Sequence, residues 1–223
     1  MKRTLFCLLF SLNAYFAFSG IFQVNGFNYF HLTKDSVAFI GCDSTMLKNN
    51  PINSINIPST ITYSDTCYQV VAIGSINSEK YPTVTDISLP SSVIRLYYDF
   101  TEIFNNYPNL KTITVSSNNK HYKSIDGVFF DKKVEILAKY PSRNTAISYS
   151  VPISVKVIYS KAFYNCEELQ NINIPASVNE IYENNFKACK NLQKITVDIE
   201  NLKYTSINGV LYNKKLIGLQ AYK

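Results

Sequence analysis

The sequence is poor in the side chains that build metal centres and catalytic sites. It has two histidines and five cysteines in 223 residues, and no CxxC or HxxxH spacing brings them together. It also lacks a Gly-x-Ser-x-Gly elbow, a Gly-rich phosphate loop and a zincin helix. A lone histidine such as His31 or His121 is most often an ordinary surface or core residue. We therefore expect no catalytic residue, no metal site and no cofactor, and we do not expect an enzyme.

Long apolar runs are almost absent, and the one present lies within residues 1–19. A basic start and a small-residue end at Ser19 give this segment the layout of a secretory signal peptide, so we expect cleavage after Ser19. An uncleaved membrane anchor is the alternative, although Ser11 and Asn13 interrupt the run and it is short for a span. No later stretch is long and apolar enough to cross a membrane. We expect a protein that is secreted or held at the cell surface.

Clusters of basic residues are also missing. The chain has 22 Lys and Arg against 16 Asp and Glu, a net charge of +6, and loss of Lys2 and Arg3 with the signal peptide leaves 20 − 16 = +4. The pairs Lys132-Lys133 and Lys214-Lys215 are the densest basic points. A nucleic-acid-binding protein needs a basic face, so we expect no nucleic-acid partner.

What the sequence does have is a repeat. Residues 151–172, VPISVKVIYSKAFYNCEELQNI, return 23 residues later as IPASVNEIYENNFKACKNLQKI at 174–195, with ten of 22 positions identical. The final Leu-x-x-Ile-x-Ile/Val part also occurs at 110–115 and, in weaker form, at 84–89 and 52–57. Its alternating apolar positions indicate strands. One such rung is too small to bury its own apolar face, so the rungs must stack.

A longer repeat overlies the first. Residues 115–140 return 82 residues later at 197–222, with 11 of 26 positions identical. Each copy joins a turn signal, Asp126-Gly127 or Asn208-Gly209, to two β-prone runs, which predicts a β-hairpin inserted between rungs. Residues 20–50 do not repeat, and we expect them to form two strands of an N-terminal β cap over the first rung.

The two consecutive rungs and the hairpin segments SIDGVFFD (124–131) and SINGVLYN (206–213) closely resemble the BspA-like, Treponema pallidum-type, leucine-rich repeat surface proteins. The resemblance covers residues 51–223, although Tyr159 and Tyr182 stand where the family usually has Gly. It implies a mostly β solenoid with short turns of helix, built as a leucine-rich-repeat-like stack of about 23-residue rungs. It also implies adhesion, because such proteins are mostly described as adhesins.

We expect the binding face to be the side of the strands that points away from the core. Its members alternate with the buried apolar positions and are mostly small and polar, so stacking would give a flat, weakly charged strip. The candidates are Ser54, Asn56, Asp86, Ser88, Thr112, Thr114, Asn171, Asn173, Lys194 and Thr196. These residues also fit a solvent-tolerant surface without a ligand. A rival contact set is formed by Tyr97, Tyr98, Tyr159 and Tyr182 in the turns, since Tyr favours interfaces.

Four cysteines remain once Cys7 leaves with the signal peptide. Cys166 and Cys189 share one slot of the repeat, so we expect both to be buried and mostly reduced, with parallel side chains about 4.8 Å apart in stacked rungs. Cys42 with Cys67 is the disulfide candidate if one exists.

Two functions remain open. The first is binding of an extracellular protein or glycan, of a host or neighbouring cell, in adhesion. The second is an antigenic or structural surface coat without a defined ligand. The first rests largely on the family resemblance, because a fold does not determine a function.

Overall fold

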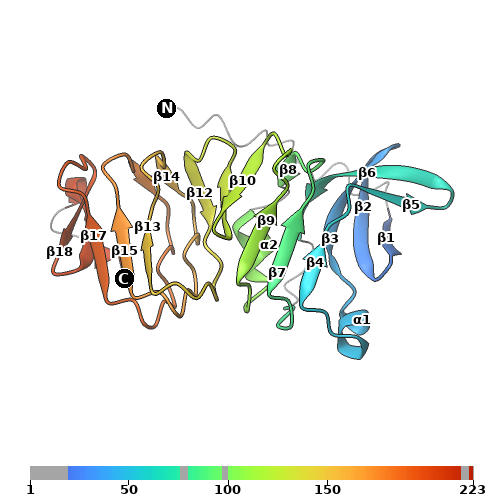
Figure 1. Cartoon of the computed structure of the whole chain (residues 1–223), viewed down its shortest axis with the longest axis horizontal. Helices are drawn as coiled ribbons and strands as arrows, with labels where there is room; N and C mark the ends of the chain where they lie inside the picture. Colours follow the sequence, from blue (N-terminus) through green and yellow to red (C-terminus); the bar gives the residue numbers. More distant parts are fainter. Residues whose placement is uncertain (1–19, 76–79, 97–99, 217–220, 223) are drawn as a thin grey trace.

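The computed structural model describes residues 20–75, 80–96, 100–216 and 221–222, and these form an elongated stack of short strands (Figure 1). The predicted signal peptide, residues 1–19, lies outside the described residues. The N-terminal strands occupy one end of the stack and the last hairpin the other.

The first strands form an antiparallel meander. It comprises β1 (Ile21–Val24), β2 (Phe27–Thr33) and β3 (Ser36–Cys42). Asn25 and Gly26 join the first two strands with φ of 51° and 78°, the positive values of a type I′ hairpin turn. The short helix α1 (Ser44–Asn49) follows, and Asp43 caps it by accepting a 2.8 Å bond from the Thr45 amide. The two strands predicted in this segment are therefore present, and β1 and α1 were not predicted.

One side of the stack consists of parallel strands from the Leu-x-x-Ile-x-Ile segments. They form two separate sheets: β4 (Ser54–Asn56), β7 (Asp86–Leu89) and β9 (Thr112–Val115), then β13 (Ser148–Ser150), β15 (Asn171–Ile174) and β17 (Lys194–Val197). The central residues Ile55, Ile87 and Ile113 are buried, while the residues beside them are wholly or partly exposed. The period-two alternation predicted for the rungs is confirmed.

A second side is built from another set of mainly parallel strand pairs. In the N-terminal half, β3 pairs with β6 (Thr66–Ile73), which pairs with β8 (Arg95–Leu96) and, antiparallel, with β5 (Thr60–Tyr63). In the C-terminal half, β12 (Ile136–Lys139) pairs with β14 (Val157–Ile158) and β14 with β16 (Glu180–Ile181). The helix α2 (Phe100–Asn105) lies on the third side of the N-terminal half.

The two predicted hairpins are present. The first is β10 (Tyr122–Ile125) with β11 (Val128–Asp131), and β11 continues into β12. The second is β18 (Tyr204–Ile207) with β19 (Val210–Asn213), followed by the 3-10 turn η2 (Lys214–Leu216) and by β20 (Ala221–Tyr222), which pairs with β19. Each hairpin turn sits against the preceding strand, because the Ile113 amide bonds to Gly127 O at 3.0 Å and the Ile195 amide to Gly209 O at 2.9 Å.

Two large apolar cores meet at β11. Phe129 belongs to the N-terminal core, and its neighbours Val128 and Phe130 belong to the C-terminal core. All three side chains are at most 1% exposed, so β11 is covered on both faces. The first hairpin therefore lies between the two halves and packs against both cores.

The structure confirms a mostly β solenoid with little helix. The short turns of helix that the resemblance implies are not found in SKAFYNC (160–166) and ENNFKAC (183–189), which form turns. In both turns the same two positions have positive φ, Lys161 and Asn165 in one rung, Asn184 and Ala188 in the next. A helical turn cannot continue through such left-handed residues.

Candidate functional site

The candidate binding residues come together in register on two sheets. Ser54, Asp86 and Thr112 are aligned across β4, β7 and β9, as are Asn56, Ser88 and Thr114. We call these six residues the N-terminal strip. On the other sheet, Asn171 is aligned with Lys194, and Asn173 with Thr196. We call these four residues, with their neighbours on β13, the C-terminal strip.

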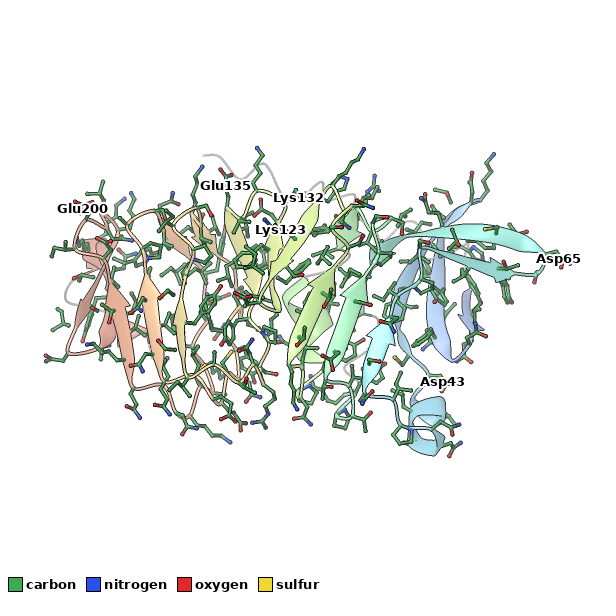
Figure 2. All side chains as sticks on the ribbon, in the orientation of Figure 1. Asp43, Asp65, Lys123, Lys132, Glu135 and Glu200 are labelled. Atoms are coloured by element: carbon green, nitrogen blue, oxygen red, sulfur yellow. The ribbon has the colours of Figure 1, made fainter. Side chains whose placement is uncertain are left out.

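Every predicted member of the two strips is accessible to solvent. Asn56, Thr114, Asn173, Lys194 and Thr196 are among the exposed ones, whereas Asp86, Ser88, Thr112 and Asn171 are half-buried. Only Asp86 and Lys194 carry charge. The labelled charges Lys132, Glu135 and Glu200 lie along one long edge of the stack and not on the strips (Figure 2). The strips are thus polar and weakly charged.

Neighbouring rungs share hydrogen bonds between their polar side chains. Ser88 Oγ lies 2.6 Å from Asn56 Oδ1 and donates to it, and Asn173 Nδ2 donates to Ser150 Oγ at 3.0 Å. These bonds hold the side chains in fixed orientations. They also occupy part of the bonding capacity that a partner would use.

The two strips are not continuous, which corrects the expectation of one strip along the molecule. The turn at Asp126-Gly127 packs beside Thr112: a Cβ on Gly127 would lie 3.4 Å from Thr112 Cα. Asn144 then donates from Nδ2 to Asp126 O, which ties the chain leading to β13 to the same turn. The hairpin insert therefore separates two three-strand patches, because its turn occupies the edge on which the next rung would pair.

The sequence reasoning missed the first strand of the C-terminal strip. In β13, Ser148 and Ser150 align with Asn171 and Asn173, and Tyr149 between them is half-buried. The signal was available, since Ser148 to Pro152 precedes Asn171 to Pro175 by the same 23 residues. It was overlooked because Tyr149 replaces the usual Ile.

The rival tyrosines are only partly described. Tyr159 is half-buried and Tyr182 is 41% exposed, and their ring centroids are 5.2 Å apart on successive rungs. Tyr97 and Tyr98 lie outside the described residues. The pair at 159 and 182 therefore forms a small aromatic surface beside β14 and β16.

The disulfide candidate of Cys42 with Cys67 is corrected by the structure, in which both are free thiols. Ser36 pairs with Gln69 in the parallel strands β3 and β6, so Cys67 lies near the start of this pair and Cys42 at its far end. At about 3.3 Å per residue the separation is roughly 20 Å or more. A disulfide needs Cα atoms within about 7 Å. Burial raises the pKa of the Cys42 thiol to about 12, so it stays protonated.

Cys166 and Cys189 are also free thiols, but only Cys166 is fully buried. Cys189 is half-buried, which corrects part of the expectation, and its Sγ lies 2.8 Å from Phe163 O. The hydrogen bond from the Cys166 thiol lowers the pKa of Cys189, while burial raises the pKa of Cys166. Of the two thiols, Cys189 is the more accessible to solvent.

The described part of the chain holds no group of three or more His, Cys, Asp and Glu side chains placed to bind a metal ion. The His31 ring stacks on Phe22 with centroids 4.5 Å apart, and His121 is exposed in the turn before β10. No helix among the described residues is both apolar enough and long enough to span a bilayer.

The repeats also match a known protein family. Residues 140–217 match the family model "BspA type Leucine rich repeat region (6 copies)". Residues 140–217 therefore carry repeats of the BspA leucine-rich type. No curated protein matches the chain.

Three solved structures illustrate the fold-level likeness. The pneumococcal vaccine antigen PcpA is 16% identical, with 79% of this chain and 69% of that chain covered and a TM-score of 0.40. A leucine rich cell surface protein from Faecalibacterium prausnitzii is 17% identical, with 89% and 59% covered and a TM-score of 0.45. The T. pallidum leucine-rich repeat protein is 20% identical, with 78% and 70% covered and a TM-score of 0.39.

Proposed function

We propose that the protein is a secreted or cell-surface binding protein that uses its strand strips to hold an extracellular protein or glycan, in adhesion to a host or neighbouring cell. The observation that carries the proposal is the registered, exposed polar alignment on β4, β7, β9 and on β13, β15, β17. The BspA-type repeats support it, because that family resemblance implies adhesion.

The chemistry of the strips favours an extended, weakly charged partner. Hydroxyl and amide groups repeat at the strand spacing of about 4.8 Å, which suits a partner that runs along the stack and bonds to several rungs. Each strip is narrow, so a stable complex needs a few central residues that supply most of the binding energy. In the C-terminal strip, Asn173 and Thr196 are exposed, adjacent and in register.

The test places bulk and charge on this strip without disturbing the core. The double variant Asn173→Arg/Thr196→Arg is expected to abolish saturable binding of the mature chain to immobilised matrix proteins and to cells. Asn179→Arg is the matched control, because Asn179 is exposed in the same rungs but lies immediately before β16. If both variants fold and the double variant binds as the wild type does, the strip is not the binding face. The variant Tyr182→Ser then tests the aromatic alternative.

A coat protein without a defined ligand is the second candidate. The bonds from Ser88 to Asn56 and from Asn173 to Ser150 favour it, because they satisfy strip side chains within the protein itself. Under this alternative no matrix protein, glycan or cell binds the mature chain saturably. The absence of such binding, with correctly folded protein, contradicts the first proposal.

We also propose that the chain is secreted and that it is not an enzyme. Signal-peptide removal is expected to leave Gly20 as the N-terminus, which N-terminal sequencing of exported protein determines. Protein that still carries Met1 after export would indicate an anchor.

A further inference from the structure

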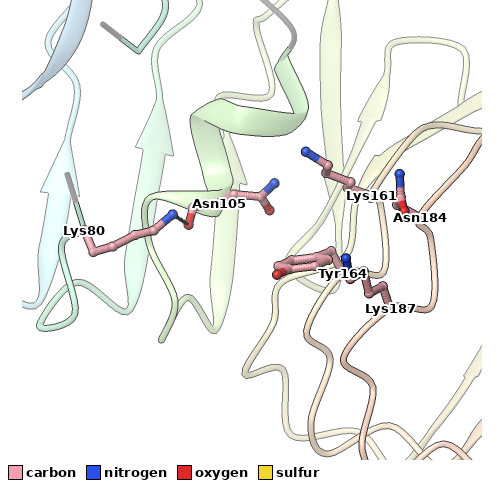
Figure 3. Close-up of a pocket in the computed structure, with 6 residues that line it drawn as sticks. All are labelled: Lys80, Asn105, Lys161, Tyr164, Asn184 and Lys187. Carbon is pink, nitrogen blue, oxygen red and sulfur yellow. Dashed lines mark hydrogen bonds between the residues drawn. The ribbon is translucent and has the colours of Figure 1, made fainter. Parts of the chain in front are cut away.

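One turn near the C-terminal end of the stack exposes two large apolar side chains. It comprises residues 198–203, DIENLK, between β17 and β18. Ile199 is 91% exposed and Leu202 is 85% exposed. The turn lies on the long edge of the stack where Glu200 is labelled (Figure 2). No residue of this turn belongs to the strand strips or to the described lining of the cavity at Asn105 (Figure 3).

The equivalent turn of the first hairpin shows that the backbone does not need these apolar side chains. Residues 116–121, SSNNKH, have the polar Ser117 and Lys120 in place of the two apolar residues. Both turns are nevertheless held in the same way, since the buried Asn119 and Asn201 each bond to two amides and two carbonyls of the main chain. Packing within the chain thus gives no reason for the exposed Ile and Leu.

The apolar surface extends along the same edge to the neighbouring rungs. Ile153, Ala176 and Ile199 occupy one slot of the repeat, 23 residues apart, and Ile153 is 86% exposed. Their turns stack, because the side chains of Ser177 and Asn201 each donate to a carbonyl of the preceding turn, at 2.8 and 2.9 Å. In the N-terminal rungs the same slot holds Ser59, Ser91 and Ser117. Apolar side chains that gather on one surface in this way are typical of contact sites.

The order of residues in the turn is self-complementary. The turn begins with the acidic Asp198 and the apolar Ile199, and it ends with the apolar Leu202 and the basic Lys203, all four exposed. When two such turns face each other about a two-fold axis between Ile199 and Leu202, each Ile199 contacts Leu202 of the second copy. Each Asp198 then lies beside Lys203 of the second copy. Such reciprocal contacts define the isologous interface of a two-fold dimer.

We propose that the 198–203 turn is a contact surface for a second copy of this chain, which packs turn to turn about a two-fold axis. The paired apolar side chains supply the attraction, and the opposite charges on either side of them fix the orientation of the two copies. The contact is small, so we expect a dissociation constant on the order of 10⁻⁵ M, as for interfaces below about 1,200 Å². The dimer uses no residue of the strips, so the inference does not depend on the proposed binding function.

Sedimentation equilibrium of the mature chain over a range of concentrations tests the contact. We expect a monomer–dimer equilibrium for the wild type. The double variant Ile199→Ser/Leu202→Lys places the residues of the first turn in the second, so it is expected to fold normally and to remain monomeric. Ile147→Ser is the matched control, because it removes a 58% exposed Ile outside the turn and is expected to dimerise as the wild type does. A wild type that stays monomeric up to about 1 mM, or a folded double variant that still dimerises, would overturn the proposal.

Charge reversal tests the two-fold geometry. Asp198→Lys and Lys203→Asp each place like charges opposite one another, so each variant alone is expected to self-associate about tenfold or more weakly than the wild type. In an equal mixture of the two variants every Lys faces an Asp, and a heterodimer of wild-type strength is expected. Fluorescence-detected sedimentation with one variant labelled measures it. A mixture that fails to associate, with both variants folded, would contradict the two-fold pairing.

A lipid surface is the other occupant that exposed Ile and Leu side chains fit. The carboxylates of Asp198 and Glu200 beside Ile199 disfavour it, because membrane surfaces that carry charge are mostly anionic. We expect no binding of the mature chain to vesicles of phosphatidylcholine and phosphatidylserine in a flotation assay. Vesicle binding by a monomeric wild type that is lost in Ile199→Ser/Leu202→Lys would show that the turn contacts lipid, and it would contradict the dimer.

Discussion

The two hairpin inserts, β10–β11 and β18–β19, are docked to the preceding rung in the same way. Asn119 and Asn201 are fully buried equivalents, and each makes four main-chain hydrogen bonds. Each Nδ2 donates at 2.9 Å to the carbonyls of the preceding Pro-x-x-Val turn: Pro90 and Val93 for one, Pro175 and Val178 for the other. Each Oδ1 accepts two amides of its own hairpin at 2.8–2.9 Å.

The hairpins differ on the side that faces the C-terminus. In the first, Val128, Phe129 and Phe130 are all buried, because rungs stack on both faces. At the three equivalent positions of the second, Leu211 is buried, and its neighbours Val210 and Tyr212 are half-exposed. The residues of a hairpin are thus sufficient to bind it to the previous rung. Its other face is buried only where another rung stacks on it.

The surface turns before the hairpins differ as well. Ile199 and Leu202 are 91% and 85% exposed, where the first copy has the polar residues Ser117 and Lys120. The contacts that dock a hairpin are repeated in the sequence, and the residues outside those contacts vary.

The largest expected loss of stability is on the hairpin face toward the C-terminus, where the two hairpins differ in burial. Phe130→Ala empties a fully buried site and is expected to cost about 3–5 kcal/mol of unfolding free energy. The equivalent Tyr212→Ala removes a half-exposed ring and is expected to cost about 1 kcal/mol. Urea unfolding of the two variants measures the difference. Equal costs would show that the second hairpin is covered as the first is.

Because Asn119 and Asn201 make equivalent hydrogen bonds, we expect their replacement to cost a similar free energy of unfolding in the two hairpins. Asn119→Ala and Asn201→Ala each leave two amides and two carbonyls of buried main chain without their partner, which is expected to cost about 3 kcal/mol. Asn119→Ala should shift the whole urea transition, since its hairpin joins both cores, whereas Asn201→Ala should loosen mainly β18 and β19. A matched control is Asn118→Ala, an exposed neighbour whose loss should be nearly neutral.

The turn glycines should behave alike in the two copies. Gly127 and Gly209 have φ of 79° and 80°, and a Cβ there would lie 3.3–3.4 Å from the preceding strand. Substitution by Ala is expected to cost about 1–2 kcal/mol at each position, because the left-handed backbone is strained for L-residues. Gly20→Ala, with nothing within 4 Å, is the neutral control. A cost at only one position would contradict equivalent docking.

Alkaline pH should lower the free energy of unfolding of both halves, by less than the substitutions above. Burial raises the pKa of Tyr29 and Tyr122 in the N-terminal core to about 12, and it also raises the pKa of Tyr140 and Tyr149 in the C-terminal half. These side chains stay protonated in the folded protein while the unfolded chain releases protons from about pH 10. Stability is therefore complete below pH 10 and falls as the pH rises toward 12. Ionisation of these four tyrosines near pH 10 in the folded protein, resolved from that of the exposed tyrosines, would contradict buried side chains with a raised pKa.

Much of the fold was predictable because the same pattern of apolar and polar residues occurs in several rungs. Ile172 and Ile195 alternate with polar neighbours at a fixed spacing, and one glycine in each hairpin turn marks the insert. The strips followed from the same alternation, since the residues beside a buried Ile must face outward.

The rest depended on contacts that no single rung contains. The break between the strips arises because the Asp126-Gly127 turn packs on Thr112, an interaction between segments 15 residues apart. The Lys139–Asn105 contact joins residues 34 apart, so it has no local signal in the sequence. Cys42 and Cys67 were paired on count alone, and the β3–β6 register separates them.

Amide hydrogen exchange at two equivalent positions tests the central claim most directly. The Ile113 and Ile195 amides both bond to a hairpin-turn glycine, at 3.0 and 2.9 Å. If the first hairpin packs against both cores, the Ile113 amide exchanges only on global unfolding. The Ile195 amide exchanges when the last hairpin opens, so it exchanges faster than the Ile113 amide. Equal protection of the two amides, or faster exchange at Ile113, would contradict it.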